Sequence, residues 1–147
     1  MAIVIHCDGA CVPNPGKGSW GIVIHHPNGD TQEISGDSEE VETTNMRMEL
    51  MAAIVALEVI DEPSTIELHS DAQYLISGMT RGFKRTKFNK DLWARLRAAA
   101  ERHQVTWSWV RGHNGDAGNE RAHTLADRFP EPNPRPAPEP PVPARRG

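Results

Sequence analysis

Short runs of apolar and branched residues, separated by turn-forming residues, predict five strands in this chain. The runs comprise residues 2–7, 20–26, 31–34, 65–70 and 105–110. Between the first three runs, residues 13–18 and 27–30 are rich in Pro, Asn and Gly, which is typical of turns. The first part of the chain is therefore expected to fold as two successive hairpins.

Apolar residues at helical spacing predict four helices in the rest of the chain. The first begins after a capping Thr43 or Thr44 and runs to about Val59, with an apolar face made of Met46, Leu50, Ala53, Ile54 and Leu57. The second covers residues 72–79, the third is marked by Leu92, Leu96 and Ala99 or Ala100, and the last covers about 119–128. This order of elements predicts an α/β fold with helices packed on a mixed sheet.

The distribution of proline divides the chain into two parts. Eight of the 12 prolines lie between Pro130 and Pro143. This composition cannot bury an apolar core and favours extended or disordered chain. We expect one globular domain over residues 1–128 and a proline-rich, disordered tail over residues 129–147. The tail is either a solvated appendage or a docking segment for a protein partner.

Charge and cysteine content exclude several classes of protein. The formal net charge is −4, which argues against a protein that coats nucleic acid by bulk charge. Cys7 and Cys11 lack the spacing of a metal site, so we expect reduced, buried thiols in a cytoplasmic protein. No apolar run approaches the ~20 residues of a membrane span, and no basic leader precedes the first apolar residues. We therefore expect a protein that does not enter the membrane. We also expect it to be a monomer.

Three acidic residues lie next to buried elements, where a charged side chain is costly unless it has a function. Asp8 and Asp71 directly follow the first and fourth predicted strands, and Glu49 lies beside the apolar face of the first helix. Open sheets place sites at the carboxyl ends of strands, and carboxylates that converge there need a cation or a proton. Oxygen ligands without thiolates favour Mg²⁺ or Mn²⁺. Taken singly, each acid is better explained as a turn or cap residue.

Five motifs resemble, in order and spacing, the type 1 ribonuclease H family. They are CDGAC at 7–11, NPG at 14–16, TNMRMEL at 44–50, SDAQY at 70–74, and GHNG at 112–115 with GNERAH at 118–123. The resemblance covers about residues 1–128 and implies a five-stranded mixed sheet flanked by helices. It also implies an endoribonuclease that hydrolyses the RNA strand of RNA–DNA hybrids with two Mg²⁺ or Mn²⁺ ions. The products would carry 5′-phosphate and 3′-hydroxyl ends.

The resemblance further implies roles for individual residues. Asp8 would bridge both ions, Glu49 and Asp71 would hold the ion at the leaving group, and Glu49 would also meet the ribose 2′-hydroxyl. His113 corresponds to a mobile histidine that assists proton transfer or product release. Contacts to the hybrid would come from the minor-groove amides and a phosphate-binding hydroxyl, namely Asn14, Asn45, Gln73 and Thr44.

Two departures from the family pattern keep alternatives open. Family members can carry a long basic protrusion, but here only the short basic segment from Arg81 to Lys90 is present. Its Lys84 and Lys87 would substitute in part for that protrusion. Alternatively, the segment is simply solvated surface. His123 stands where the family usually has a fourth active-site aspartate and would be a metal ligand, with Glu120 or Asp127, each about one helical turn away, as substitutes. We therefore weigh an active hybrid-specific ribonuclease against a catalytically weak hybrid-binding module and, more distantly, a DNA-cleaving metal nuclease.

Overall fold

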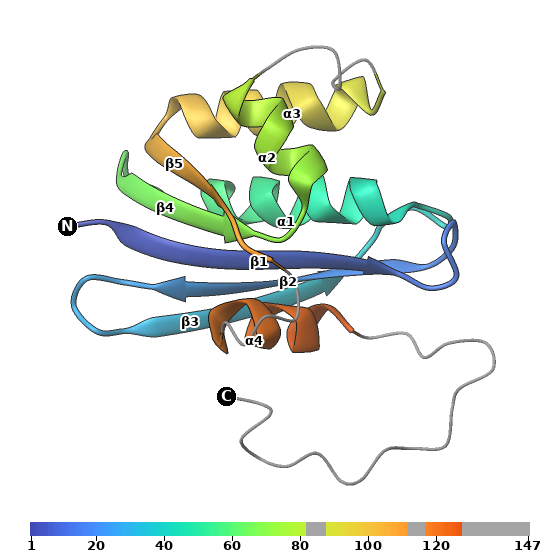
Figure 1. The fold of residues 1–147 in the computed structure, drawn as a ribbon, viewed down its shortest axis with the longest axis horizontal. Coiled ribbons are helices and arrows are strands. Elements are labelled where there is room, and N and C mark those ends of the chain that lie inside the picture. The colour runs from blue at the N-terminus through green and yellow to red at the C-terminus, as the bar shows by residue number, and fades with distance from the viewer. Residues whose placement is uncertain (82–87, 112–116, 128–147) are drawn as a thin grey trace, which may run out of the picture.

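A computed structural model describes residues 1–81, 88–111 and 117–127, and all structural statements below concern these residues. Five strands and four helices alternate as the sequence predicts (Figure 1). Their bounds are β1 Ile3–Cys11, β2 Gly18–His25, β3 Thr31–Asp37, α1 Asn45–Glu58, β4 Thr65–Ser70, α2 Gln73–Thr80, α3 Lys90–Glu101, β5 Gln104–Trp109 and α4 Ala117–Ala126.

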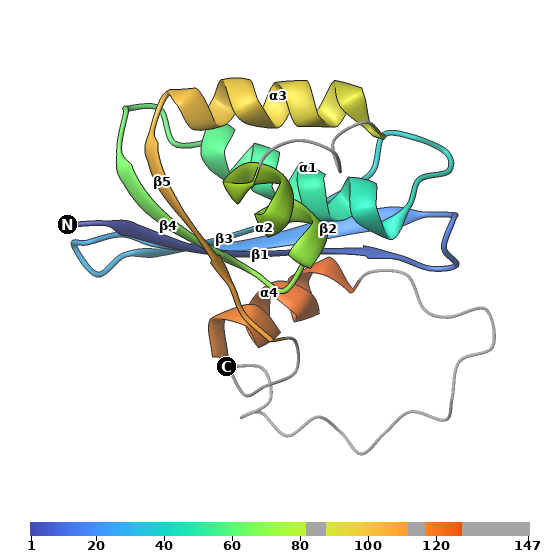
Figure 2. The same cartoon turned by 45° about the horizontal axis from the view of Figure 1, so that its top comes forward.

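The strands form one mixed sheet in the order β3-β2-β1-β4-β5. β1 pairs with β2, and β2 with β3, as antiparallel hairpins, whereas β4 lies parallel to both β1 and β5. Helices α1, α2 and α3 cover one face of the sheet, and α4 lies on the opposite face (Figure 2). The predicted five-stranded mixed sheet with flanking helices is confirmed.

The core lies between the sheet and the three helices on one face. Alternate residues of β1 and β4 point into it and meet the alanine-rich side of α1, where Ala52, Ala53 and Ala56 are fully buried. Small residues let the helix approach the sheet closely, which strengthens dispersion contacts. Trp93 of α3 is also fully buried, and its ring lies over Gly78 of α2, where a Cβ would collide with it.

Two strands are longer than the sequence predicts. β1 continues beyond Cys7 to Cys11 because its second half pairs with β2, so Asp8 lies inside a strand and not at its end. The parallel pairing of β1 with β4 ends at His6, opposite His69, and Asp8 is therefore just beyond that pairing. β3 continues past Ile34 to Asp37 because these added residues pair with β2.

The buried faces of two helices also differ from the prediction. Met46 is half exposed, and Met48 is buried in its place because its side chain packs over Gly18 at the start of β2. Helix α4 begins two residues earlier than predicted, at Ala117, and Gly118 in its first turn lies against the ring of His6. Thr44 caps α1 as predicted, since its side chain accepts a hydrogen bond from the Arg47 N–H.

Cys7 and Cys11 are both free and buried, as the sequence predicts. Within the described ranges, no helix combines the length and the apolar character that a membrane crossing requires.

Candidate active site

Three carboxylates from distant parts of the chain meet just beyond the point where the parallel pairing of β1 with β4 ends. Asp8 comes from β1, Glu49 from α1, and Asp71 from the residue after β4, and one oxygen of each lies within 4.8 Å of the other two. Asp8 is almost fully buried, with 4% of its surface exposed. The three acids that the sequence singles out are therefore brought together by the fold.

Gly9 allows Glu49 to reach the other two acids. The backbone of α1 at Met48 and Glu49 passes so close to Gly9 that a Cβ there would collide with it. In this close contact the Gly9 N–H donates a hydrogen bond of 2.8 Å to Oε1 of Glu49. A glycine next to Asp8 thus sets both the approach of the helix and the orientation of the Glu49 carboxyl.

The electrostatics of the cluster favour a bound cation. Burial, followed by the charge of Asp8 and a hydrogen bond with it, raises the pKa of Glu49 well above its usual value. Burial also raises the pKa of the adjacent Cys7 thiol, which stays protonated and offers no thiolate. The remaining donors are all carboxylate oxygens, so the set fits a hard divalent cation such as Mg²⁺ or Mn²⁺.

His123 lies at the edge of this cluster, on α4. Its Nδ1 is 2.8 Å from Oδ2 of Asp8, and the side chain is 46% exposed. This hydrogen bond is the main cause that raises the pKa of His123, because the protonated form of the ring partly compensates the charge of the carboxylates. Among the described residues, the ligand atoms that converge within 4.8 Å of one another belong to Asp8, Glu49 and Asp71. His123 contacts Asp8 but is not in this group, and neither are Glu120 and Asp127.

Four of the predicted substrate contacts lie around the first turns of α1 and α2. Oδ1 of Asn14 accepts a hydrogen bond of 3.1 Å from the backbone N–H of Asn45, so these two exposed residues are neighbours. Gln73 is the first residue of α2, exposed and two positions after Asp71. The hydroxyl of Thr44 caps α1. Three further predicted residues, His113, Lys84 and Lys87, lie outside the described residues.

Two residues that support the site received no role from the sequence. Trp109, at the end of β5, donates its indole N–H to the carbonyl of Asp71 at 3.2 Å. Arg47 of α1 pairs with Asp91 at 2.7 Å and with Glu40 at 3.0 Å, which ties the start of α1 to α3. Arg47 stands inside a recognisable motif, whereas only the pairing of β4 with β5 brings Trp109 to Asp71.

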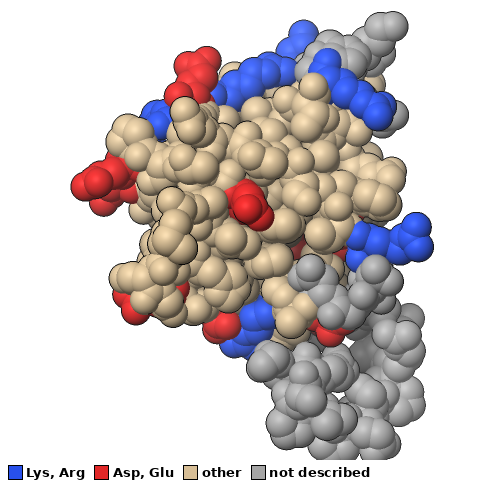
Figure 3. All heavy atoms as spheres, turned by 60° about the vertical axis from the view of Figure 1, so that its left-hand side comes forward, with Lys and Arg blue, Asp and Glu red and all other residues tan. Residues whose placement is uncertain are grey.

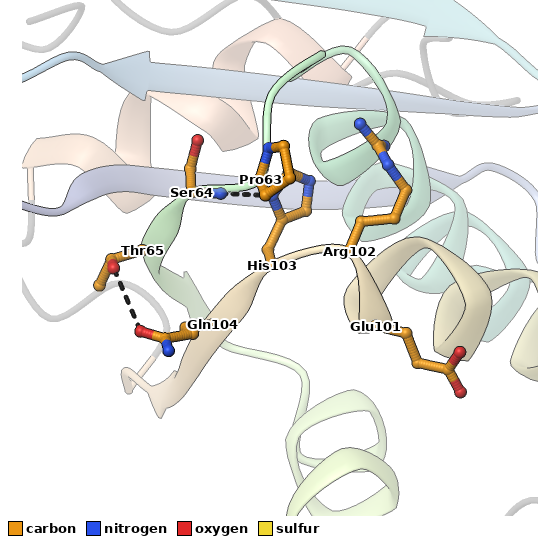
Figure 4. A pocket seen from close by; sticks show the side chains of 7 residues that line it. All are labelled: Pro63, Ser64, Thr65, Glu101, Arg102, His103 and Gln104. Carbon is orange, nitrogen blue, oxygen red and sulfur yellow. Dashed lines mark hydrogen bonds between the residues drawn. The ribbon is translucent and has the colours of Figure 1, made fainter.

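A hollow of about 320 Å³ lies at the opposite end of β4 and β5, remote from the carboxylates along the strands (Figure 4). It is lined by Pro63, Ser64, Thr65, Glu101, Arg102, His103 and Gln104. Nδ1 of His103 accepts from the Ser64 N–H, and its Nε2 lies 3.1 Å from the carbonyl of Leu57. These contacts join α1, β4 and β5, so His103 has a structural role and the hollow contains no predicted site residue.

Charged side chains on the face shown in Figure 3 are scattered and of both signs, with uncharged residues between them. The formal net charge of −4 and this scattered distribution do not attract a polyanion to the surface as a whole. A polyanion would have to be attracted by a local basic segment. Of the basic run predicted for that task, Arg81 and Lys90 are described, whereas residues 82–87 are not.

Comparison with known proteins agrees with this geometry. Residues 1–129 match the family model described as RNase H. Ribonuclease HI of Xylella fastidiosa (strain 9a5c) is 45% identical over 137 residues, which cover 85% of this chain and 89% of the relative. Ribonuclease H of Xanthomonas campestris pv. campestris (strain 8004) is 46% identical, with the same coverage.

Solved structures show the same fold. LC9-RNase H1, described as a type 1 RNase H with the type 2 active-site motif, is 31% identical with a TM-score of 0.72, over 85% of this chain and 70% of that chain. LC11-RNase H1 in complex with RNA/DNA hybrid is 24% identical with a TM-score of 0.72, over 85% of this chain and 94% of that chain, a likeness of fold. With its carboxylate cluster and its matches over nearly the whole described body, this chain belongs to the ribonuclease H family of enzymes.

Proposed function

We propose that the protein is an endonuclease that hydrolyses the RNA strand of RNA–DNA hybrids and leaves 5′-phosphate and 3′-hydroxyl ends. The observation that carries this proposal is the convergence of Asp8, Glu49 and Asp71 within 4.8 Å in a chain of this family. The names of its relatives and the hybrid bound to LC11-RNase H1 support the substrate class.

Asp8, Glu49 and Asp71 would hold two divalent cations, Mg²⁺ or Mn²⁺. When bound, two such cations lower the pKa of the attacking water and neutralise the charge that develops on the leaving 3′ oxygen. The chain itself orients Glu49 through the Gly9 N–H and excludes water from Asp8 by burial. A bound cation would favour the ionised form of Glu49 and so oppose the rise in its pKa.

Recognition of the hybrid would rest on amides around the cluster. Asn14 uses its Oδ1 for the Asn45 backbone, which leaves its amide NH₂ and the Asn45 side chain available for sugar hydroxyls and base edges. Gln73 would contact the same minor groove from α2. Glu49 would meet the ribose 2′-hydroxyl, the group that distinguishes RNA from DNA. Phosphate contacts would come from Thr44, Lys84 and Lys87, and His113 would assist proton transfer or product release.

His123 would be the fourth ligand, at the ion that activates the water. An imidazole offers one neutral nitrogen where an aspartate offers charged oxygens, and Mg²⁺ prefers oxygen. A histidine at the position of the fourth ligand favours the second candidate function, a catalytically weak module that binds hybrids. Its distinguishing outcome would be tight binding of hybrid with negligible cleavage in either metal.

The test is cleavage of labelled RNA–DNA hybrid, duplex RNA and duplex DNA, with Mg²⁺ and Mn²⁺ in parallel. We expect cleavage of the RNA strand of the hybrid alone. Asp8→Asn should abolish it while circular dichroism stays unchanged, because the amide keeps the shape but removes the charge that the cations need. Asp30→Asn, in an exposed turn, is the matched control and should cleave like wild type. Equal rates for wild type and Asp8→Asn would refute the assigned site.

A further inference from the structure

Helix α4 crosses three strands on the face of the sheet opposite α1 (Figure 2). Its residue Ala122 lies over Gly21 of β2, where a Cβ would come within 2.5 Å of the Ala122 carbonyl oxygen. On one side of this contact His123 reaches Asp8 of β1, and on the other Arg121 reaches Glu33 of β3. Three consecutive residues of α4 thus contact three adjacent strands.

Helical geometry places the two side contacts on opposite flanks. Successive residues of an α-helix are rotated by about 100°, so Arg121 and His123 project to either side of Ala122. Nε and Nη2 of Arg121 donate to the two carboxylate oxygens of Glu33, each at 2.7 Å. A bidentate pair of this kind fixes orientation as well as distance.

The other contacts of α4 limit different movements. Gly21 and Gly118 set how closely the helix approaches the sheet, because side chains there would collide with α4 and with His6 respectively. The hydroxyl of Ser19 donates to the carbonyl of Ala126 and holds the end of the helix. The ion pair of Arg121 with Glu33 limits rotation of α4 about its own axis. This pair lies on the flank of α4 that faces away from the carboxylate cluster.

We propose that Arg121 and Glu33 form a positioning pair that fixes the rotation of α4 and so holds His123 against Asp8. This inference rests on the proposed function, through the place of His123 beside the bound cation. Without the pair the helix can turn, and His123 moves away from Asp8 although both residues are intact. Arg121 touches no reacting atom and acts only through His123.

The test uses Arg121→Gln, with Arg95→Gln as matched control. Arg95 makes an equivalent bidentate pair with Glu58, at 2.9 and 2.7 Å, between α3 and α1. The readouts are calorimetric titration with Mn²⁺ in the absence of substrate, and the melting temperature (Tm). We expect Arg121→Gln to weaken Mn²⁺ binding by about 10-fold, a typical effect for a residue that orients a ligand, and Arg95→Gln to leave it unchanged. Both variants should lose a similar, small amount of Tm.

The charge-exchanged variant Glu33→Arg/Arg121→Glu should recover most of the Mn²⁺ affinity. Equal Mn²⁺ affinity for Arg121→Gln and Arg95→Gln would overturn the inference, and so would His123→Ala binding Mn²⁺ like wild type. A wild-type protein that binds Mn²⁺ but does not cleave hybrid would refute the proposed function instead, while the titrations still decide whether the pair positions His123.

Discussion

The Glu49 carboxyl lies partly buried beside two other carboxylates, and its charge is costly there. Because the folded state holds its proton more tightly than the unfolded state does, ionisation of Glu49 lowers the free energy of unfolding as pH rises through the raised pKa. The cluster therefore lowers stability at high pH, and a cation bound there would offset this cost. Sites of this kind commonly gain stability when the charge is removed.

We predict that Glu49→Gln raises Tm in the presence of a chelator, by roughly 4 °C for each kcal/mol of repulsion removed. The Gln side chain keeps the hydrogen bond from the Gly9 N–H. The gain should be larger at pH 8 than at pH 5, and added Mg²⁺ should raise the Tm of wild type more than that of the variant. Thermal scans at both pH values measure this, with the exposed Glu101→Gln as control. An unchanged Tm at pH 8 would show that repulsion in the cluster is already compensated.

His123 determines the metal preference and the acid limb of activity in the proposed function. The protonated ring repels a cation, and the hydrogen bond to Asp8 raises the pKa of His123 above the reference of ~6.5 in the metal-free protein. At limiting metal concentration, protons should therefore compete with the cation at a higher pH than they would at a free histidine. Activity should favour Mn²⁺ over Mg²⁺. We predict that His123→Asp strengthens Mg²⁺-dependent cleavage and moves the acid limb to lower pH, whereas His123→Ala weakens turnover.

Rates of hybrid cleavage between pH 5 and 9 in each metal measure these effects. A second readout is stability without metal. The pair of His123 with Asp8 stabilises the fold fully below the unfolded pKa and loses this effect as pH rises through the raised pKa. His123→Ala should therefore lower Tm at pH 5.5 and have little effect at pH 9. If His123→Ala has no effect on cleavage, His123 is not a metal ligand. Glu120→Gln and Asp127→Asn are then the variants to test.

At the scale of elements, two glycines set how closely helices approach the sheet at the site. Gly9 lets α1 deliver Glu49, and Gly21 lets α4 deliver His123 from the opposite face. The site is therefore assembled between helices on both faces, with β1 as the strand they share. Either helix can be displaced by a single methyl group.

We predict that Gly21→Ala lowers both Tm and Mg²⁺- or Mn²⁺-dependent cleavage. Its Cβ would lie 2.5 Å from the Ala122 carbonyl oxygen, so α4 must move away from β2 at a cost of about 1–3 kcal/mol. The measurements are the cleavage rate per folded molecule and the metal concentration that gives half of the maximal rate. Gly36→Ala is the control, because its Cβ would meet the Trp20 ring, so it should lower Tm with normal metal dependence. Identical metal dependence in both variants would exclude displacement of His123.

At the scale of the whole molecule, the family match ends at residue 129 and the last described helix ends at Ala126. We predict that deleting residues 130–147 leaves Tm and cleavage rate nearly unchanged, because a segment of this composition has no apolar face to pack. Thermal scans and hybrid cleavage by the truncated chain test this. A loss of several degrees would mean that the tail docks on the body.

Local signals in the sequence were sufficient for much of this protein. Hydrophobic periodicity and turn residues predicted the order of strands and helices, Thr44 marked the start of α1, and the motifs singled out Asp8, Glu49 and Asp71. These signals work because side-chain spacing and capping depend on residues a few positions apart.

Tertiary structure decided the rest, because pairing and burial depend on residues far apart in the chain. The extension of β1 past Asp8 required β2 as a partner, and the raised pKa of Glu49 required burial beside Asp8. His123 meets Asp8 across 115 positions only because α4 rests on Gly21 and is held at Glu33. The sequence by itself determined which side chains are candidates for the chemistry, and the packing of helices on both faces of one sheet determined their distances, their orientations and the direction of their pKa shifts.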